Sequence, residues 1–158
     1  MISTCSCSPK SWYVERRLVG EVLRELILEA QDEELVDGLE HHLEQTRDNV
    51  SRAEQAFRLA AAEPSAARSA PFESLVAEHA EAAPKIVLRR LADVFHAAAA
   101  AQTEHHEIAA YATLVELARA LDQPDAAKLL EQTLIEERDA LKHVSELLPR
   151  LARQAAEP

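Results

Sequence analysis

Apolar side chains recur every three or four residues over four long stretches of the chain, which is the spacing of one face of an α-helix. Three of these stretches begin with residues that favour the start of a helix: a capping hydroxyl at Ser8 before a proline, a carboxylate at Asp32, and a first-turn proline at Pro124. The stretch after Asp32 has its stripe at Val36, Leu39, Leu43, Thr46, Val50, Ala53 and Phe57. The pattern predicts four long helices, running from Ser8 to about residue 30, from Asp32 to about 62, from about 85 to 121, and from Pro124 onward.

Short connections join these helices in two pairs. The turns near residues 30–32 and within 121–126 are tight, so each pair is expected to form an antiparallel hairpin. Between the hairpins, residues 63–71 have two prolines and no periodicity, which predicts a loop, and residues 72–82 predict a short helix. The predicted fold class is all-α: a four-helix bundle of two antiparallel hairpins with a short extra helix in the crossover.

A single domain accounts for most of the chain. The bundle is expected over residues 11–148, after a flexible leader at 1–10. Pro149 is expected to break or bend the last helix, because proline lacks the N–H that an inner turn requires. Residues 149–158 are therefore predicted to form a C-terminal tail.

Composition and charge agree with an all-α fold and exclude several classes of function. Alanine and leucine dominate, aromatic and β-branched residues are scarce, and there are only two glycines, too few for a phosphate-binding loop. The net charge is −11 without a basic stripe, so we expect neither nucleic-acid nor anionic-membrane binding. We find no membrane-spanning run and no secretion signal, and Cys5 and Cys7 are too few for a disulfide framework. A cytoplasmic location is expected.

Several ionisable side chains are predicted to face the bundle interior. At 100° per residue, Glu137 lies on the apolar stripe of the last helix, and Glu104 shares a face with Ile108 and Val115. Four further residues complete the inward-facing set or lie near its edge: Glu15, His42, Thr46 and Glu107. Glu44 points away.

These inward groups are also predicted to lie at one height. Glu107 and Glu137 are each fifteen residues from position 122, and Glu15 and Gln45 are each fifteen from position 30. Each pair therefore lies about 22 Å from its own turn. Carboxylates buried together must hold protons, pair with cations such as Arg16 or Arg47, or bind metal. Carboxylate and imidazole ligands at this spacing suit iron or manganese, with two ions bridged by shared carboxylates.

Each residue also has a simpler structural interpretation. A single inward glutamate often buries its stem and leaves its carboxylate in water. His42 and His105 can be hydrogen-bonded packing residues, His106 a surface residue, and Tyr111 part of the core. The coincidence of Glu15, Glu104, Glu107 and Glu137 in direction and height favours the metal interpretation.

The segments AAQTEHHEIAAYATL and AAKLLEQTLIEERDALKHVSEL resemble the YciE/YciF family of ferritin-like bacterial proteins, as do GLEHHLEQT and YVERRL. The resemblance covers about residues 12–148. It implies a ferritin-like, rubrerythrin-related bundle, often dimeric, that is associated with stress responses and has a two-metal site. By position, the residues that match the family's polar motifs are Glu15, His42, Glu104, Glu107 and Glu137.

Two departures from the family pattern keep two functional hypotheses open. Gln45 stands where the family has a glutamate, and Leu141 where it often has an aspartate. The first hypothesis is a metal-binding bundle, with iron or manganese as cofactor, that handles oxygen or peroxide. The alternative is a non-catalytic, homodimeric structural or interaction bundle that has lost its metal. Ferritin-type storage in a large shell is a third, weaker hypothesis.

Overall fold

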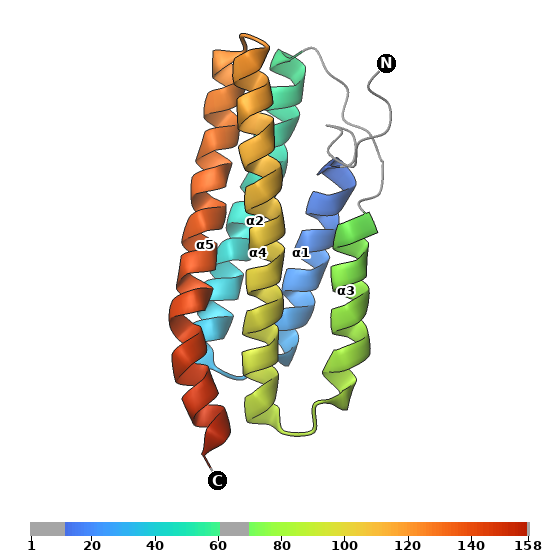
Figure 1. Cartoon of the computed structure of the whole chain (residues 1–158), viewed down its shortest axis with the longest axis vertical. Coiled ribbons are helices and arrows are strands. Elements are labelled where there is room, and N and C mark those ends of the chain that lie inside the picture. The colour runs from blue at the N-terminus through green and yellow to red at the C-terminus, as the bar shows by residue number, and fades with distance from the viewer. Residues whose placement is uncertain (1–11, 61–69, 158) are drawn as a thin grey trace.

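The chain forms five α-helices and one short 3₁₀ turn over the residues that the structure describes (Figure 1). This computed structural model describes residues 12–60 and 70–157, with side chains from Leu18 onward in the first helix. The elements are α1 (Trp12–Glu29), α2 (Glu33–Leu59), α3 (Ala70–Ala82), η1 (Ala83–Lys85), α4 (Arg89–Ala120) and α5 (Pro124–Ala156). The leader at 1–10 and most of the loop predicted at 63–71 lie outside the described residues.

Two antiparallel hairpins, α1–α2 and α4–α5, lie side by side and form the predicted four-helix bundle (Figure 1). Helix α5 packs along α4 and α2, while α1 packs along α2 and contacts α4. The crossover helix α3 lies on the outside of the bundle against α4, and its Phe72 joins the cluster formed by α1. None of the described helices is long and apolar enough to cross a membrane.

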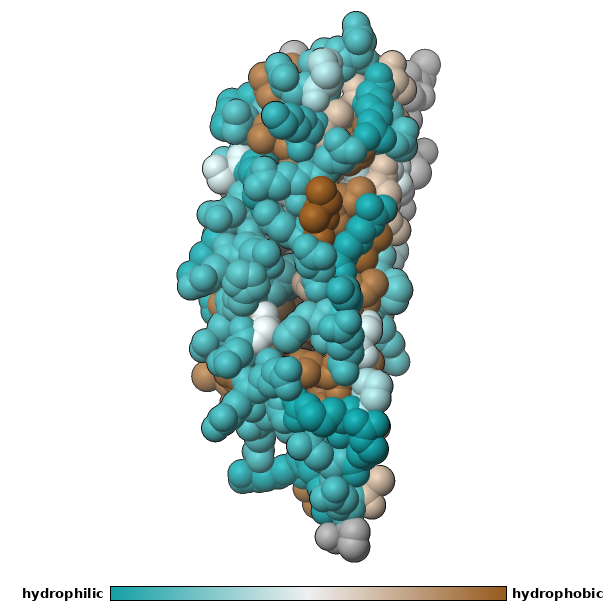
Figure 2. All heavy atoms as spheres, turned by 90° about the vertical axis from the view of Figure 1, so that its left-hand side faces the viewer, coloured by the Kyte–Doolittle hydropathy of each residue, from teal (hydrophilic) through white to brown (hydrophobic). Residues whose placement is uncertain are grey.

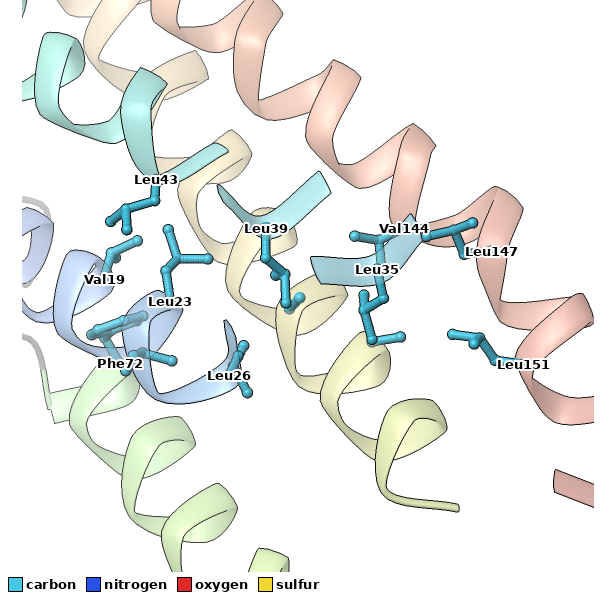
Figure 3. Packing of buried hydrophobic residues seen from close by; sticks show 13 residues of the cluster. Val19, Leu23, Leu26, Leu35, Leu39, Leu43, Phe72, Val144, Leu147 and Leu151 are labelled. Atoms are coloured by element: carbon cyan, nitrogen blue, oxygen red, sulfur yellow. The ribbon is translucent and has the colours of Figure 1, made fainter. Parts of the chain in front are cut away.

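The apolar core is divided into two clusters by a polar layer. One cluster gathers side chains from α1, the first half of α2, the start of α4 and the end of α5, including Leu23, Leu39 and Val144 (Figure 3). The other gathers the opposite halves of α2, α4 and α5, including Phe57 and Val115. The face on the α5 side is mostly hydrophilic with small apolar patches (Figure 2). The residues between the clusters are therefore the ones whose polarity needs an explanation.

Most predicted helix boundaries agree with the structure. Asp32 caps α2 by accepting a hydrogen bond from the Leu35 backbone N–H at 3.1 Å, and Pro124 opens α5. The helix predicted from about residue 85 begins at Arg89 instead. Pro84 lies in the 3₁₀ turn and Leu88 has an extended backbone, so the chain needs residues 83–88 to reverse direction.

The prediction of a separate tail at 149–158 is wrong, because α5 does not break at Pro149 and continues to Ala156. Pro149 and Ser145 both lie on the exposed side of α5. The Ser145 carbonyl, which cannot bond to proline, can therefore accept a hydrogen bond from water. On the opposite side Leu147 and Leu151 are buried, and their packing stabilises the last turns.

The extension of α5 also ties down the α1–α2 turn. Arg150 donates two hydrogen bonds to the Asp32 carboxylate, at 2.5 and 2.7 Å, and a third to Glu34 at 2.9 Å. The hydrogen bonds from Arg150 lower the pKa of Asp32. On the other side of the turn, the Gln31 backbone N–H donates to Asp93 of α4 at 2.8 Å. The start of α4 and the end of α5 therefore both bind the α1–α2 turn and fix its position.

We predict that Asp32→Ala lowers the free energy of unfolding by about 1–2 kcal/mol, because it removes the cap of α2 together with the partner of Arg150. Asp32→Asn should lose less, because asparagine caps a helix equally well. A lowered carboxyl pKa stabilises the fold above the unfolded value of 3.8 and loses that effect as pH falls. Urea unfolding should therefore show that the difference in free energy of unfolding between wild type and Asp32→Ala becomes smaller in acid. Equal stability of the two proteins at neutral pH would contradict the prediction.

Candidate metal centre

Four ionisable residues from three helices meet between the two apolar clusters, and we call them the mid-bundle layer. They are His42 from α2, Glu104 and Glu107 from α4, and Glu137 from α5. Each is at most 4% exposed, and one ligand atom from each lies within 4.8 Å of those from the others. The structure thus brings together four of the five residues singled out from the sequence. Glu15 belongs to α1, but its side chain lies outside those described.

Helical geometry explains why these side chains converge. Glu104 and Glu107 are three residues apart on α4, so both project from the same face. The neighbouring positions Ala97 and Ala100 are buried, and their small side chains let α4 approach the other helices closely. The layer lies where α4 and α5 reach the same distance from their common turn, as the count of residues from position 122 predicts.

His42 is the centre of the layer. Its Nε2 lies 3.1 Å from Glu104 Oε1 and 3.4 Å from Glu137 Oε2. Burial alone lowers the pKa of His42, but the surrounding carboxylates, led by Glu104, outweigh burial and raise that pKa to about 9. Burial raises the pKa of Glu104 to about 7, although His42 opposes this rise. In the absence of metal, the layer therefore holds protons that free side chains would release at lower pH.

A network of side-chain hydrogen bonds fixes the position of Glu137, and the sequence pattern did not predict it. Asn49 is fully buried and donates from Nδ2 to Glu137 Oε1 at 2.9 Å. Its Oδ1 accepts a hydrogen bond from the Thr133 hydroxyl at 3.3 Å and another from Arg52, which also pairs with Glu136. The predicted stripe holds at five of its seven positions, but Val50 is half-buried and the neighbouring Asn49 is the buried residue. The available signal was the spacing of Asn49, seven residues after His42 and three after Thr46.

Other candidates from the sequence lie outside the layer. His105 and Glu44 are exposed, and Arg47, considered as a partner for the acidic layer, is also exposed. Tyr111 is buried in the second apolar cluster. His106 was expected at the surface, but it is half-buried against Phe72, with ring centroids 5.9 Å apart. The extra helix α3 covers this part of α4, which helical periodicity within α4 could not reveal.

The two departures from the family pattern have different positions. Gln45 is half-buried beside the layer, where its Oε1 lies 3.4 Å from His42 Nδ1. It therefore contacts the ring nitrogen opposite to the one that faces the carboxylates. Leu141 is half-buried on α5 and lies outside both the layer and the two apolar clusters.

A cavity of about 420 Å³ connects the layer with the surface between α2 and α5. Its inner wall includes His42 and Glu104, and its outer wall carries Asp37, Asp139 and His143. Gly38 permits this arrangement, because a Cβ at that position would lie 2.5 Å from His143 Nε2. A small molecule or ion can therefore approach the layer from an acidic surface.

The donor set fits a divalent transition metal. Glu104 Oε2 is buried and accepts no hydrogen bond, an unfavourable state for a carboxylate oxygen unless a cation or proton compensates. Three carboxylates and one imidazole suit iron or manganese. The di-iron bundles typically use a glutamate from two helices and a Glu-x-x-His pair from the other two, whereas Ala140 stands three residues after Glu137 here. The described side chains therefore supply enough ligands for one ion.

Comparisons with known proteins agree with the geometry. A family model described as a domain of unknown function, DUF892, matches residues 10–157. Protein YciF of Escherichia coli strain K12 is 31% identical over 127 residues, which cover 80% of this chain and 76% of YciF. The crystal structure of the E. coli stress protein YciF has a TM-score of 0.86 at 27% identity and covers 92% of each chain. YcfI of Rhodopseudomonas palustris, described as a candidate structural protein, has a TM-score of 0.83 at 29% identity and covers 87% of each chain.

These matches confirm the resemblance to the YciE/YciF family. The structural likeness extends over most of both chains and is accompanied by sequence identity, so it reflects more than a shared bundle architecture. Because the family model spans nearly the whole sequence, the chain belongs to the DUF892 family.

Proposed function

We propose that this protein is a cytoplasmic, homodimeric, metal-binding bundle that holds iron, or else manganese, at the mid-bundle layer and acts in a stress response. The observation that carries the proposal is the convergence of His42, Glu104, Glu107 and Glu137 within 4.8 Å in a buried layer. When bound, iron would supply redox chemistry toward a small oxidant such as oxygen or peroxide at an open coordination position. The cavity between α2 and α5 supports access of such a molecule.

The chain's own residues have distinct parts in this proposal. His42 presents Nε2 toward the carboxylates, while Gln45 can accept a hydrogen bond from Nδ1–H and so hold the ring in the ligating tautomer. Asn49 fixes one oxygen of Glu137 and leaves the other directed toward His42. Glu15 would be a further ligand from α1, and a second ion would depend on it.

The alternative function, a structural or interaction bundle without metal, is favoured by one specific observation. With its pKa raised to about 9, His42 is an imidazolium at neutral pH and partly compensates the buried carboxylates without any metal. The description of the relative YcfI as a candidate structural protein supports this alternative, whereas the description of YciF as a stress protein supports a stress role. Metal binding is the property that distinguishes the two functions.

We predict that purified protein binds at least one Fe²⁺ or Mn²⁺ per chain under anaerobic conditions, and that the ion raises the melting temperature. Glu104→Gln keeps the shape of the side chain but removes a charged ligand, so affinity should fall by at least about tenfold. Glu44→Gln, an exposed change on α2, is the matched control and should bind as wild type does. Equilibrium dialysis with metal analysis measures the affinity. No binding by wild type, or equal binding by Glu104→Gln, would favour the alternative function.

The pH dependence should have opposite signs with and without metal. Both raised pKa values stabilise the metal-free fold below the unfolded values of 4.5 and 6.5, and this effect is lost as pH rises through about 7 for Glu104 and about 9 for His42. The melting temperature of metal-free protein should therefore fall as pH rises across this window. Metal affinity should instead rise by about tenfold per pH unit for each proton released. His42→Gln should flatten the upper part of the stability profile, and a metal-free melting temperature that rises with pH would refute this prediction.

Sedimentation equilibrium should give a homodimer. Apolar side chains exposed at the corner between α3 and α4, Val87, Leu88 and Leu91, offer surface that a dimer could bury. A large shell would instead indicate ferritin-type storage, and a concentration-independent monomer would contradict the homodimer.

A further inference from the structure

A second group of ionisable side chains lies where α1, α3 and α4 meet. His79 of α3 and His96 of α4 face each other, with His79 Nε2 3.2 Å from His96 Nδ1. On the far side of the His96 ring, Nε2 lies 3.7 Å from Glu29 Oε2 of α1. His96 precedes Glu104 by eight residues on the same helix, which places the pair about 12 Å along the helix from the mid-bundle layer. The two groups are therefore separate.

The spacing of the two ring nitrogens matches that of two ligands on one metal ion. Zinc binds imidazole nitrogen at about 2.0–2.1 Å, and two such ligands at a tetrahedral angle lie about 3.4 Å apart. The observed 3.2 Å is close to this value, so the two nitrogens are spaced as two ligands of one ion would be. In the absence of metal, one ring can donate a hydrogen bond to the other at the same separation.

Neighbouring side chains contact both rings on the sides away from the shared nitrogens. Phe95 stacks on His79, with ring centroids 4.9 Å apart and an angle of 15° between the planes. The carboxylate of Glu29 beside His96 Nε2 favours a proton on that nitrogen, which leaves Nδ1 with its lone pair toward His79. Histidine ligands of metals commonly donate their second ring N–H to a carboxylate, and Glu29 lies on that side of His96 at ion-pair distance.

The local charge also favours a cation. Glu25 and Glu29 act on His79 from α1, and Asp93 acts on His96 from its own helix.

We propose that His79 Nε2 and His96 Nδ1 form a second metal site, which takes a divalent ion of the zinc type that prefers imidazole ligands and links α3 to α4. Water would complete the coordination, because the chain contributes two nitrogens at this point. The site would fix the crossover helix, in which Phe72 is the single buried residue. This inference does not depend on the mid-bundle layer binding metal.

Zn²⁺ binding and amide hydrogen exchange of α3 test the proposal together. We expect Zn²⁺ to slow exchange within residues 70–82 in wild type and in Glu104→Gln/Glu137→Gln, which removes charged ligands of the mid-bundle layer. His79→Ala should abolish this slowing and weaken Zn²⁺ binding in that double-variant background by at least about tenfold. His105→Ala removes an exposed imidazole from α4 and is the matched control.

A further variant guards against a purely structural effect of His79→Ala. Glu29→Gln leaves both imidazoles in place and should weaken Zn²⁺ binding by about tenfold, while metal-free α3 exchanges as in wild type. The proposal is overturned if Zn²⁺ leaves exchange in α3 unchanged in wild type, or slows it equally in His79→Ala. The two histidines would then be a hydrogen-bonded packing pair. If metal binds only at the mid-bundle layer, the proposed function stands and the second metal site is refuted.

Discussion

Three carboxylates are buried around one imidazole at the centre of the bundle, and they impose an electrostatic cost that the helix packing must offset. An isolated charge removed from water costs several kcal/mol, so Glu104, Glu107 and Glu137 cannot remain together without compensation. His42 supplies one positive charge, and burial raises the pKa of Glu104, so that this carboxyl group holds a proton more readily than in water. Protons and a metal ion would compete for the same atoms, which is why the metal-free and metal-bound states should respond oppositely to pH.

Such a layer persists because apolar packing on both sides holds the helices together. One cluster, around Leu23, Leu39 and Val144, lies on the side of the α1–α2 turn, and the other, around Phe57 and Val115, lies on the side of the α4–α5 turn. The contacts of Arg150 with Asp32 keep the first turn fixed against the end of α5. Within the layer, the bond from Asn49 restrains Glu137. The bundle thus offers a rigid frame for a group of side chains that repel one another.

The two proposed metal sites differ in chemistry and in consequence. The mid-bundle layer is rich in carboxylates and suits iron or manganese, whereas the His79–His96 pair offers only imidazole nitrogen and suits zinc-type ions. The first would neutralise charge inside the core. The second would fasten α3, which otherwise rests on the bundle through Phe72 and a few partly buried side chains. Selectivity between metals could therefore arise within a single chain from ligand type alone.

The helices, their pairing and most of the central layer could be predicted from the amino-acid sequence. Periodicity located each helix, tight turns made the hairpins, and the distance from position 122 placed Glu107 and Glu137 at one height, because helical rise is uniform. Gln45 and Leu141 were also recognisable as departures from the family pattern. These properties follow from local geometry, which every residue of a helix shares.

Features that arise between helices could be seen only in the folded chain. The buried face of α2 is wider than the predicted stripe and includes Asn49, which bonds to Glu137, and α5 passes Pro149 because packing of Leu151 outweighs one lost hydrogen bond. His79 and His96 meet across a turn whose path no periodicity predicts. Contacts between separate helices depend on their relative rotation and docking, and these are set by the sum of many packing interactions rather than by the spacing of residues along the chain.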